Sequence, residues 1–319
     1  MPTADAKSAF TGPTAEIPVD PGLSVVDISA ADPSDAGMPV AGIPAASPSA
    51  TGAPLTGVPI AEAPVFGISI ADVNARAVDR WNAAGWEWGR PISHETFELA
   101  RRGTWSVLLT PTKPVPRAWF PANLAGLRVL GLASGGEQQM PIFAALGCRC
   151  TVLDYAPSQL ASDRMVAERE GYDIEVVRAD MARPLPFADE AFDLVFHPVA
   201  NCYIREVLPL WRECYRVLAP GGRLLAGLDN GFNYVVDNDE QRVVNALPFD
   251  PLAHPEQRAQ LEADDSGLQF SHTFEEQIRG QLQAGLRLVD CYEDTNGQGR
   301  LHELGIPSYW ATCAERPHG

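Results

Sequence analysis

Residues 129–160 hold the residue types best suited to binding a small ligand. An apolar segment, Arg128–Ala133, predicts a strand that runs into a glycine turn at 134–136, and a second apolar segment, Cys150–Asp154, ends on a carboxylate. The carboxyl ends of neighbouring parallel strands meet at the sheet edge where ligands bind. Glycines let the backbone approach a ligand closely, and a carboxylate accepts hydrogen bonds from both hydroxyls of a ribose. The segment therefore predicts a site for a nucleoside-containing cofactor, with Asp154 at its ribose.

The C-terminal part of the chain predicts the sheet that positions this site. From Arg128 onward, strands and helices alternate at βαβ spacing, which favours a parallel sheet with helices on both faces. Two final strands, with no helix expected between them, favour an antiparallel hairpin at the edge. We therefore expect an α/β, doubly wound, seven-stranded, mostly parallel sheet. The expected strands are 128–133, 150–154, 174–179, 192–197, 223–228, 286–292 and 306–313, and the expected helices are 137–146, 157–170, 205–218 and one opened by the capping box Thr273-x-x-Glu276 and ending at Gly285.

Composition divides the chain into three parts. Residues 1–68 hold 11 of the 28 prolines and show no helical or strand periodicity, which predicts a disordered tail. Residues 69–127 favour an N-terminal helical cap. Residues 128–319 form the sheet domain, which a polar insertion interrupts at about 230–270.

The cap is expected to contain two helices. Asp72 predicts the start of one that runs to Ala84, and Ser93 predicts the start of another that runs to Arg102. We expect one aromatic residue of the cap to line the site. Three tryptophans are expected to form its core: Trp81, Trp105 and Trp119.

Charge and cysteine content argue against several classes of partner. The net charge of −17 makes a nucleic-acid partner unexpected, because such binders need a basic footprint. The sequence has no run of about 18 apolar residues, so no membrane-spanning helix is expected. The six cysteines lack the spacing of a zinc site. We therefore expect no metal, and reduced thiols in a cytoplasmic protein.

Four motifs together resemble the class I S-adenosylmethionine-dependent methyltransferases, from about Arg128 to the C-terminus. They are the glycine turn, the acid that ends the second strand, Arg178-Ala179-Asp180-Met181, and the turn Leu218-Ala219-Pro220-Gly221-Gly222 before the fifth strand. The resemblance implies S-adenosylmethionine as cofactor, with its methionine part wrapped by the loop, its ribose on the acid and its adenine beside the Asp-Met pair. The cofactor-binding residues that it implies are Ala133, Ser134, Gly135, Asp154, Tyr155, Asp180, Met181 and His197.

The glycine turn departs from the family pattern Asp-x-Gly-x-Gly-x-Gly. This chain has Gly131 in place of the acid, Ala133 in place of the first glycine of the turn, and Glu137 in place of the last. Ala133 still permits close approach of the backbone. The loss of the acid removes one usual polar neighbour of the cofactor, and Glu137 could take over part of its role. A purely structural alternative is a tight turn, with Asp154 as the cap of the next helix.

Residues after the fourth strand lie where methyl donor and acceptor meet in this family. The resemblance makes His197 a candidate general base and makes Asn201 and Tyr203 candidates for orienting the acceptor. Alternatively, His197 contacts the cofactor and Tyr203 only packs. The segment does not match the Asn/Asp-Pro-Pro-Tyr/Phe motif of amino-group methylation. Asp229-Asn230-Gly231, after the fifth strand, is expected to form a turn or to contact substrate. Two isolated histidines are expected in solvated loops: His272 and His302.

The function that these patterns predict is methyl transfer from S-adenosylmethionine to an unidentified acceptor, with a small molecule favoured over a protein. Two alternatives stay open. Gly131-x-Ala133-x-x-Gly136, with an acid at Asp154, also fits an NAD(P)-dependent oxidoreductase. The irregular glycine loop also fits a non-catalytic S-adenosylmethionine-binding regulatory module. The sequence predicts no oligomeric state.

Overall fold

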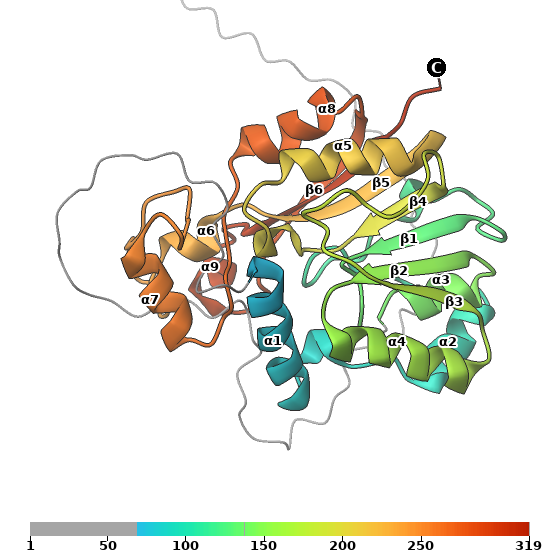
Figure 1. Cartoon of the computed structure of the whole chain (residues 1–319), viewed down its shortest axis with the longest axis horizontal. Coiled ribbons are helices and arrows are strands. Elements are labelled where there is room, and N and C mark those ends of the chain that lie inside the picture. The colour runs from blue at the N-terminus through green and yellow to red at the C-terminus, as the bar shows by residue number, and fades with distance from the viewer. Residues whose placement is uncertain (1–68, 137, 319) are drawn as a thin grey trace, which may run out of the picture. The chain divides into compact units, whose positions relative to one another are not determined.

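The computed structural model describes residues 69–136 and 138–318, so the tail at 1–68 and Glu137 lie outside the described residues. Its strands are β1 (Arg128–Leu132), β2 (Arg149–Asp154), β3 (Ile174–Arg178), β4 (Phe192–His197), β5 (Leu218–Asp229), β6 (Arg287–Asp294) and β7 (Tyr309–Glu315). They form one sheet of seven strands in the order β3-β2-β1-β4-β5-β7-β6 (Figure 1). β1 to β5 are parallel, and β7 is antiparallel to both β5 and β6. The predicted α/β sheet and its antiparallel edge pair are confirmed.

Helices cover both faces of the sheet. The α-helices are α1 (Ile70–Ala83), α2 (His94–Arg101), α3 (Met140–Ala145), α4 (Pro157–Glu170), α5 (Leu208–Val217), α6 (Phe232–Val235), α7 (Pro255–Ala263), α8 (Gly280–Gln283) and α9 (Gly299–Glu303). Shorter turns are η1 (Glu87–Gly89), η2 (Arg117–Trp119), η3 (Asn201–Tyr203) and a π turn, η4 (Glu275–Arg279). α5 and α8 lie on one face, and α2, α3 and α4 on the other (Figure 1). Because neighbouring strand residues point to opposite faces, Val129 packs in one core and Leu130 in the other.

The start of α1 corrects one prediction. The N-cap is Ser69 and not Asp72, since the Ser69 Oγ accepts the Asp72 backbone N–H at 3.1 Å. The Ser69 hydroxyl also donates to the Asp72 carboxylate at 2.8 Å. Either residue type can cap a helix, so the choice depended on where the helical turn begins. The predicted cap at Ser93 is confirmed by its contact with the Thr96 N–H.

Several boundaries also differ from the predictions. α5 starts at Leu208 and not at 205, because Arg205 lies in the preceding loop and pairs with Asp250. α3 starts at Met140, later than predicted. β5 already starts at Leu218, which pairs with Phe192 of β4. The expectation of no helix between the last two strands is wrong, because α9 lies there.

Burial corrects two further expectations. Trp119 is buried, and its indole N–H donates to Asp290 at 2.7 Å, as a core residue would. Trp81 is only half-buried, and its indole donates to the backbone of Asp265, so its assignment to the core is wrong. His272 is only 6% exposed and is not a solvated loop residue, whereas His302 is exposed as predicted. Among the described residues no helix is long and apolar enough to cross a membrane.

Candidate functional site

The glycine turn after β1 lies directly against the acid that ends β2. The Gly135 N–H donates to the Asp154 carboxylate at 3.2 Å. A Cβ atom at Gly135 would lie 3.0 Å from that oxygen and 2.7 Å from the Cβ of Gln159, so this position has no space for a side chain. Ala133 adopts a left-handed backbone with φ of 48°, a conformation that glycine adopts with less strain. The turn and the acid therefore form one rigid unit.

The Asp154 carboxylate keeps capacity for a ligand. Its second oxygen accepts the Ala156 N–H at 3.0 Å, and burial raises the pKa of the carboxyl. An ionised carboxylate offers about four lone-pair positions. The backbone N–H groups of Gly135, Ala156 and Tyr155 therefore leave one such position open to a ligand. The Ala179 N–H, at the end of β3, donates to the Asp154 backbone oxygen at 3.2 Å and brings the predicted adenine segment to the same edge.

The segment predicted to lie beside the adenine combines a polar and an apolar side chain. Asp180 is partly exposed and accepts the Ala182 N–H at 2.9 Å, while Met181 is buried at 8% exposure. On the other side of Asp154, the Tyr155 hydroxyl donates to Asp72 of α1 at 3.0 Å. The structure thus brings the sequence-predicted cofactor residues to one edge of the sheet.

The cap holds this edge through several polar contacts. The Ser158 N–H, at the start of α4, donates to Asp79 of α1 at 3.0 Å. The Gln138 side chain donates to the backbone oxygen of Glu87 in η1 at 2.7 Å. Gly136 faces the Trp88 carbonyl so closely that a Cβ atom would lie 2.9 Å from it. The cap therefore lies against the glycine turn.

His197 ends β4 and is fully buried. Its Nδ1 lies 2.8 Å from the Leu132 carbonyl oxygen, an arrangement in which Nδ1 carries the proton and Nε2 presents a lone pair. Among the described residues this Nε2 has no hydrogen-bond partner. Burial lowers the pKa of the imidazole to about 4, so the ring is neutral at physiological pH. Such a pKa makes His197 a weak base, and its catalytic role stays a prediction.

Asn201 is oriented by a residue that the sequence analysis missed. Its Nδ2 donates to the side-chain oxygen of Gln277, whose own Nε2 donates to the backbone oxygen of Asp229. This chain of donors fixes the amide, so that Oδ1 faces away from Gln277. Oδ1 is buried, and no atom of the described chain donates to it. No motif signalled Gln277, which lies 76 residues after Asn201 and reaches it from the π turn η4.

A cluster of buried phenols surrounds the end of β5. Tyr234 and Tyr309 are buried, and burial raises the pKa of each phenol far above its usual range. Asp229 lies among them, accepts N–H groups from Gly231 and Asn233, and has a pKa raised to about 6 by burial. Tyr203, the third residue predicted to be catalytic, lies near both this cluster and Asp154. Burial raises the pKa of its phenol, and electrostatic interactions with Tyr309 and Asp154 raise it further. Asp229-Asn230-Gly231 was expected to form a turn or to contact substrate, and the bond from the Gly231 N–H to Asp229 closes that turn.

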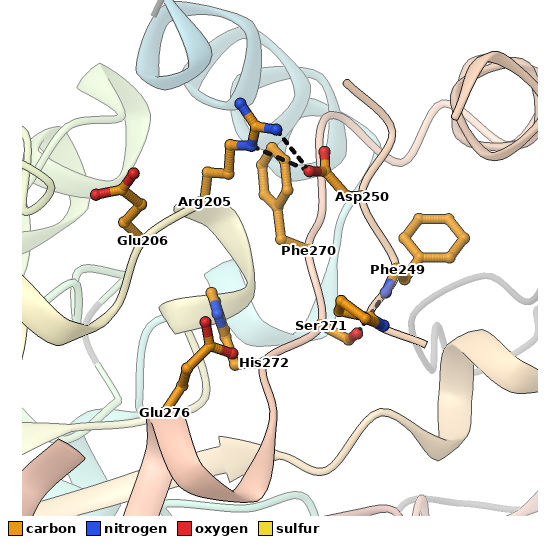
Figure 2. Close-up of a pocket in the computed structure, with 9 residues that line it drawn as sticks. Arg205, Glu206, Phe249, Asp250, Phe270, Ser271, His272 and Glu276 are labelled. Carbon is orange, nitrogen blue, oxygen red and sulfur yellow. Dashed lines mark hydrogen bonds and ion pairs between the residues drawn. The ribbon is translucent and has the colours of Figure 1, made fainter. Parts of the chain in front are cut away.

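A pocket of about 400 Å³ opens on the insertion side of η3 (Figure 2). Arg205 pairs there with Asp250 at 2.8 Å, and the carboxylates of Glu206 and Glu276 also line it. The His272 Nε2 lies 3.0 Å from the Asn201 backbone oxygen, so the pocket wall supports η3. Its lining includes no predicted cofactor residue. Within the described chain, no group of three or more His, Cys, Asp or Glu residues could hold a metal ion.

Comparison with known proteins identifies the family. The model of a methyltransferase domain matches residues 130–226. The uncharacterized methyltransferase YbaJ of Bacillus subtilis is 41% identical over 231 residues, which cover 70% of this chain and 90% of that protein. The chain belongs to the class I S-adenosylmethionine-dependent methyltransferases.

Two further similarities agree with this family. The demethylmenaquinone methyltransferase of Thermus thermophilus is 39% identical over 100 residues, 31% of this chain and 45% of that enzyme. A solved S-adenosylmethionine-dependent methyltransferase from Mesorhizobium loti has the same fold, with a TM-score of 0.51 and 19% identity over 63% of this chain and 95% of that one. The methyltransferase is therefore an enzyme whose cofactor is S-adenosylmethionine. The oxidoreductase and the non-catalytic module are set aside.

Proposed function

We propose that this methyltransferase modifies a small molecule at the edge of the sheet formed by β1, β4 and β5. The observation that carries the proposal is the contact between Gly135 and Asp154, with the buried phenols of Tyr234 and Tyr309 further along the sheet near the end of β5. Ala133, Ser134 and Gly135 would surround the methionine part of the cofactor. Asp154 would accept from its ribose, and the residues beside its adenine would be Tyr155, Asp180 and Met181.

The acceptor is proposed to be a hydroxylated aromatic molecule. The buried side chains of Tyr234 and Tyr309 offer aromatic faces, and Asp229 offers an acceptor for a hydroxyl. The relative from Thermus thermophilus is named for methylation of demethylmenaquinone, which gives quinols first place in a screen. The cap at 69–127 and the insertion at 230–270 would close over this acceptor. We propose a cytoplasmic location because the six cysteines form no disulfide.

The bound cofactor supplies an electrophilic methyl group on a sulfonium. The residues of the chain have to hold an acceptor in line with that methyl and keep water away, and such positioning is worth about 7–11 kcal/mol. Asn201 and Tyr203 would orient the acceptor. The low pKa of His197 suits a neutral contact to a ligand N–H or O–H better than proton removal.

Asp229 is proposed as the group that takes a proton from the acceptor hydroxyl. Its pKa of about 6 leaves it ionised at neutral pH, and a proton acceptor must be ionised to work. We therefore expect kcat to rise as the pH increases through about 6. Asp229→Asn should lose that limb of the profile. If Asp229→Asn keeps the rise of kcat near pH 6, another group is responsible for that rise.

The test of the proposed function is a screen for the demethylated product, S-adenosylhomocysteine. Purified enzyme, S-adenosylmethionine and a panel of quinols, catechols and phenols are incubated without oxygen, and the methylated product is identified by mass spectrometry. Methylation of one class, lost in Asp154→Ala, supports the proposal. Methylation only of protein or amine acceptors in a parallel panel would overturn it.

A further inference from the structure

The cofactor of this enzyme carries two cationic groups, the sulfonium and the α-ammonium, and the glycine turn lacks the acid that usually lies near them. A carboxylate side chain at Gly131 would have to displace the side chain of Met140. A Cβ atom there would lie 2.6 Å from the sulfur of Met140, which is fully buried. Among the described residues, the glycine turn at 131–136 therefore offers no carboxylate for the amino-acid end of the cofactor.

The cap brings one carboxylate to this place. Glu87 opens η1, and its backbone oxygen accepts from the Gln138 side chain at 2.7 Å, two residues beyond Gly136. The next residue, Trp88, has its carbonyl against Gly136. The backbone of η1 thus lies against the glycine turn, and the Glu87 side chain starts from that contact.

The Glu87 carboxylate lacks a partner for one of its oxygens. Its Oε1 is buried, and among residues 69–136 and 138–318 no donor reaches it. Burial raises the pKa of this carboxyl, and the charge of Arg90 offsets the effect only in part. A buried carboxylate oxygen without a donor is costly. An ammonium group with three N–H donors would remove that cost.

A chain of amides holds η1 on the turn. Gln159 donates to the Gly135 carbonyl at 3.2 Å and accepts from the Asn82 side chain at 2.9 Å. The Asn82 side-chain oxygen in turn lies close to Gly89, at the end of η1. A Cβ atom at Gly89 would lie 1.8 Å from that oxygen, so only glycine fits there. Glu87 is therefore held at a fixed distance from the loop that wraps the cofactor.

We propose that Glu87, on the cap, is the counter-charge for the α-ammonium of S-adenosylmethionine and replaces the acid missing at Gly131. The proposal rests on the cofactor site assigned above. It predicts that the cap contributes directly to cofactor binding and does not only cover the acceptor.

The test compares two ligands that differ at the amino-acid end. S-adenosylhomocysteine has the ammonium, whereas 5′-methylthioadenosine has the same nucleoside without it. In Glu87→Gln, calorimetry should show affinity for S-adenosylhomocysteine reduced about tenfold, the effect of one charge-assisted hydrogen bond, and affinity for 5′-methylthioadenosine changed less than about twofold. Glu95→Gln makes the same change of charge on an exposed residue of α2 and should bind both ligands like the wild type.

Three results would count against the proposal, and they are distinguishable. Unchanged binding of S-adenosylhomocysteine in Glu87→Gln overturns the role of Glu87 alone. An equal loss for both ligands, or the same loss in Glu95→Gln, shows a structural or long-range effect and also overturns it. Failure of the wild type to bind S-adenosylhomocysteine would overturn the assigned cofactor site and this proposal together.

Discussion

Asp154→Ala is expected to reduce the affinity for S-adenosylhomocysteine by at least about 100-fold. The ribose would lose an ionised acceptor, and each bond of this kind contributes about 1.5–3 kcal/mol. The variant also removes the acceptor of the Gly135 and Ala156 N–H groups, so the glycine turn loses its fixed position. Both effects act on the same ligand, which makes this the largest binding loss expected from any single carboxylate of the site.

Calorimetric titration measures this loss, with Asp173→Ala as the matched control. Asp173 is exposed, precedes β3 at its amino end, and therefore lies away from the carboxyl edge. The control should bind like the wild type. A thermal melt of each variant without ligand separates loss of binding from loss of folding. Wild-type affinity in a folded Asp154→Ala protein would contradict the assignment of the ribose site.

The central strands of the sheet could be predicted from sequence because they are buried on both faces. β4 reads Phe-Asp-Leu-Val-Phe-His, and its predicted bounds match those observed. α4 was also predicted with its observed bounds, since Pro157 suits the first turn and Gly171 takes the left-handed conformation at the end. Apolar strand segments, and prolines and glycines at helix ends, are local signals. Contacts with distant parts of the chain did not change the bounds that they predict.

Helix starts were less predictable because two residues can compete for one cap. Ser69 and Asp72 both have cap side chains, and the structure uses them together, with Ser69 as the N-cap. The His272 side chain could not be placed either. It is buried because the insertion folds back onto η3, a contact between segments about 70 residues apart.

The residues of the site also fall into two groups, those that local sequence predicts and those that it does not. The glycine turn and Asp154 were predicted because one βαβ unit contains them both. Glu87 and Gln277 were not, because each acts through a contact with a distant segment. Gln277 also lies in a π turn, whereas the capping box at Thr273 and Glu276 predicts only an ordinary helix. Turns of this kind occur often at functional sites, but no sequence pattern reports them.

The chain of hydrogen bonds through Gln277 leads to the second large effect. In the wild type, Gln277 fixes the orientation of the Asn201 amide. The Asn201 oxygen is directed away from η4, where it can accept a hydrogen bond from a ligand. Gln277→Leu removes both bonds while filling a similar volume. The Asn201 amide is then free to turn its donor toward the acceptor substrate. We expect kcat with the acceptor found in the screen to fall between about 10-fold and about 100-fold, because the buried group is misoriented.

Gln281→Leu is the matched control for this variant. Gln281 is also buried on the same face, four residues further on, and it bonds the Gln277 backbone and Thr312 without touching Asn201. Both variants lose buried amide bonds, so both should melt at lower temperature. Only Gln277→Leu should lose turnover, and neither should change the affinity for S-adenosylhomocysteine by more than about twofold. Equal losses of kcat in the two variants would show that Gln277 stabilises the helix and does not position Asn201.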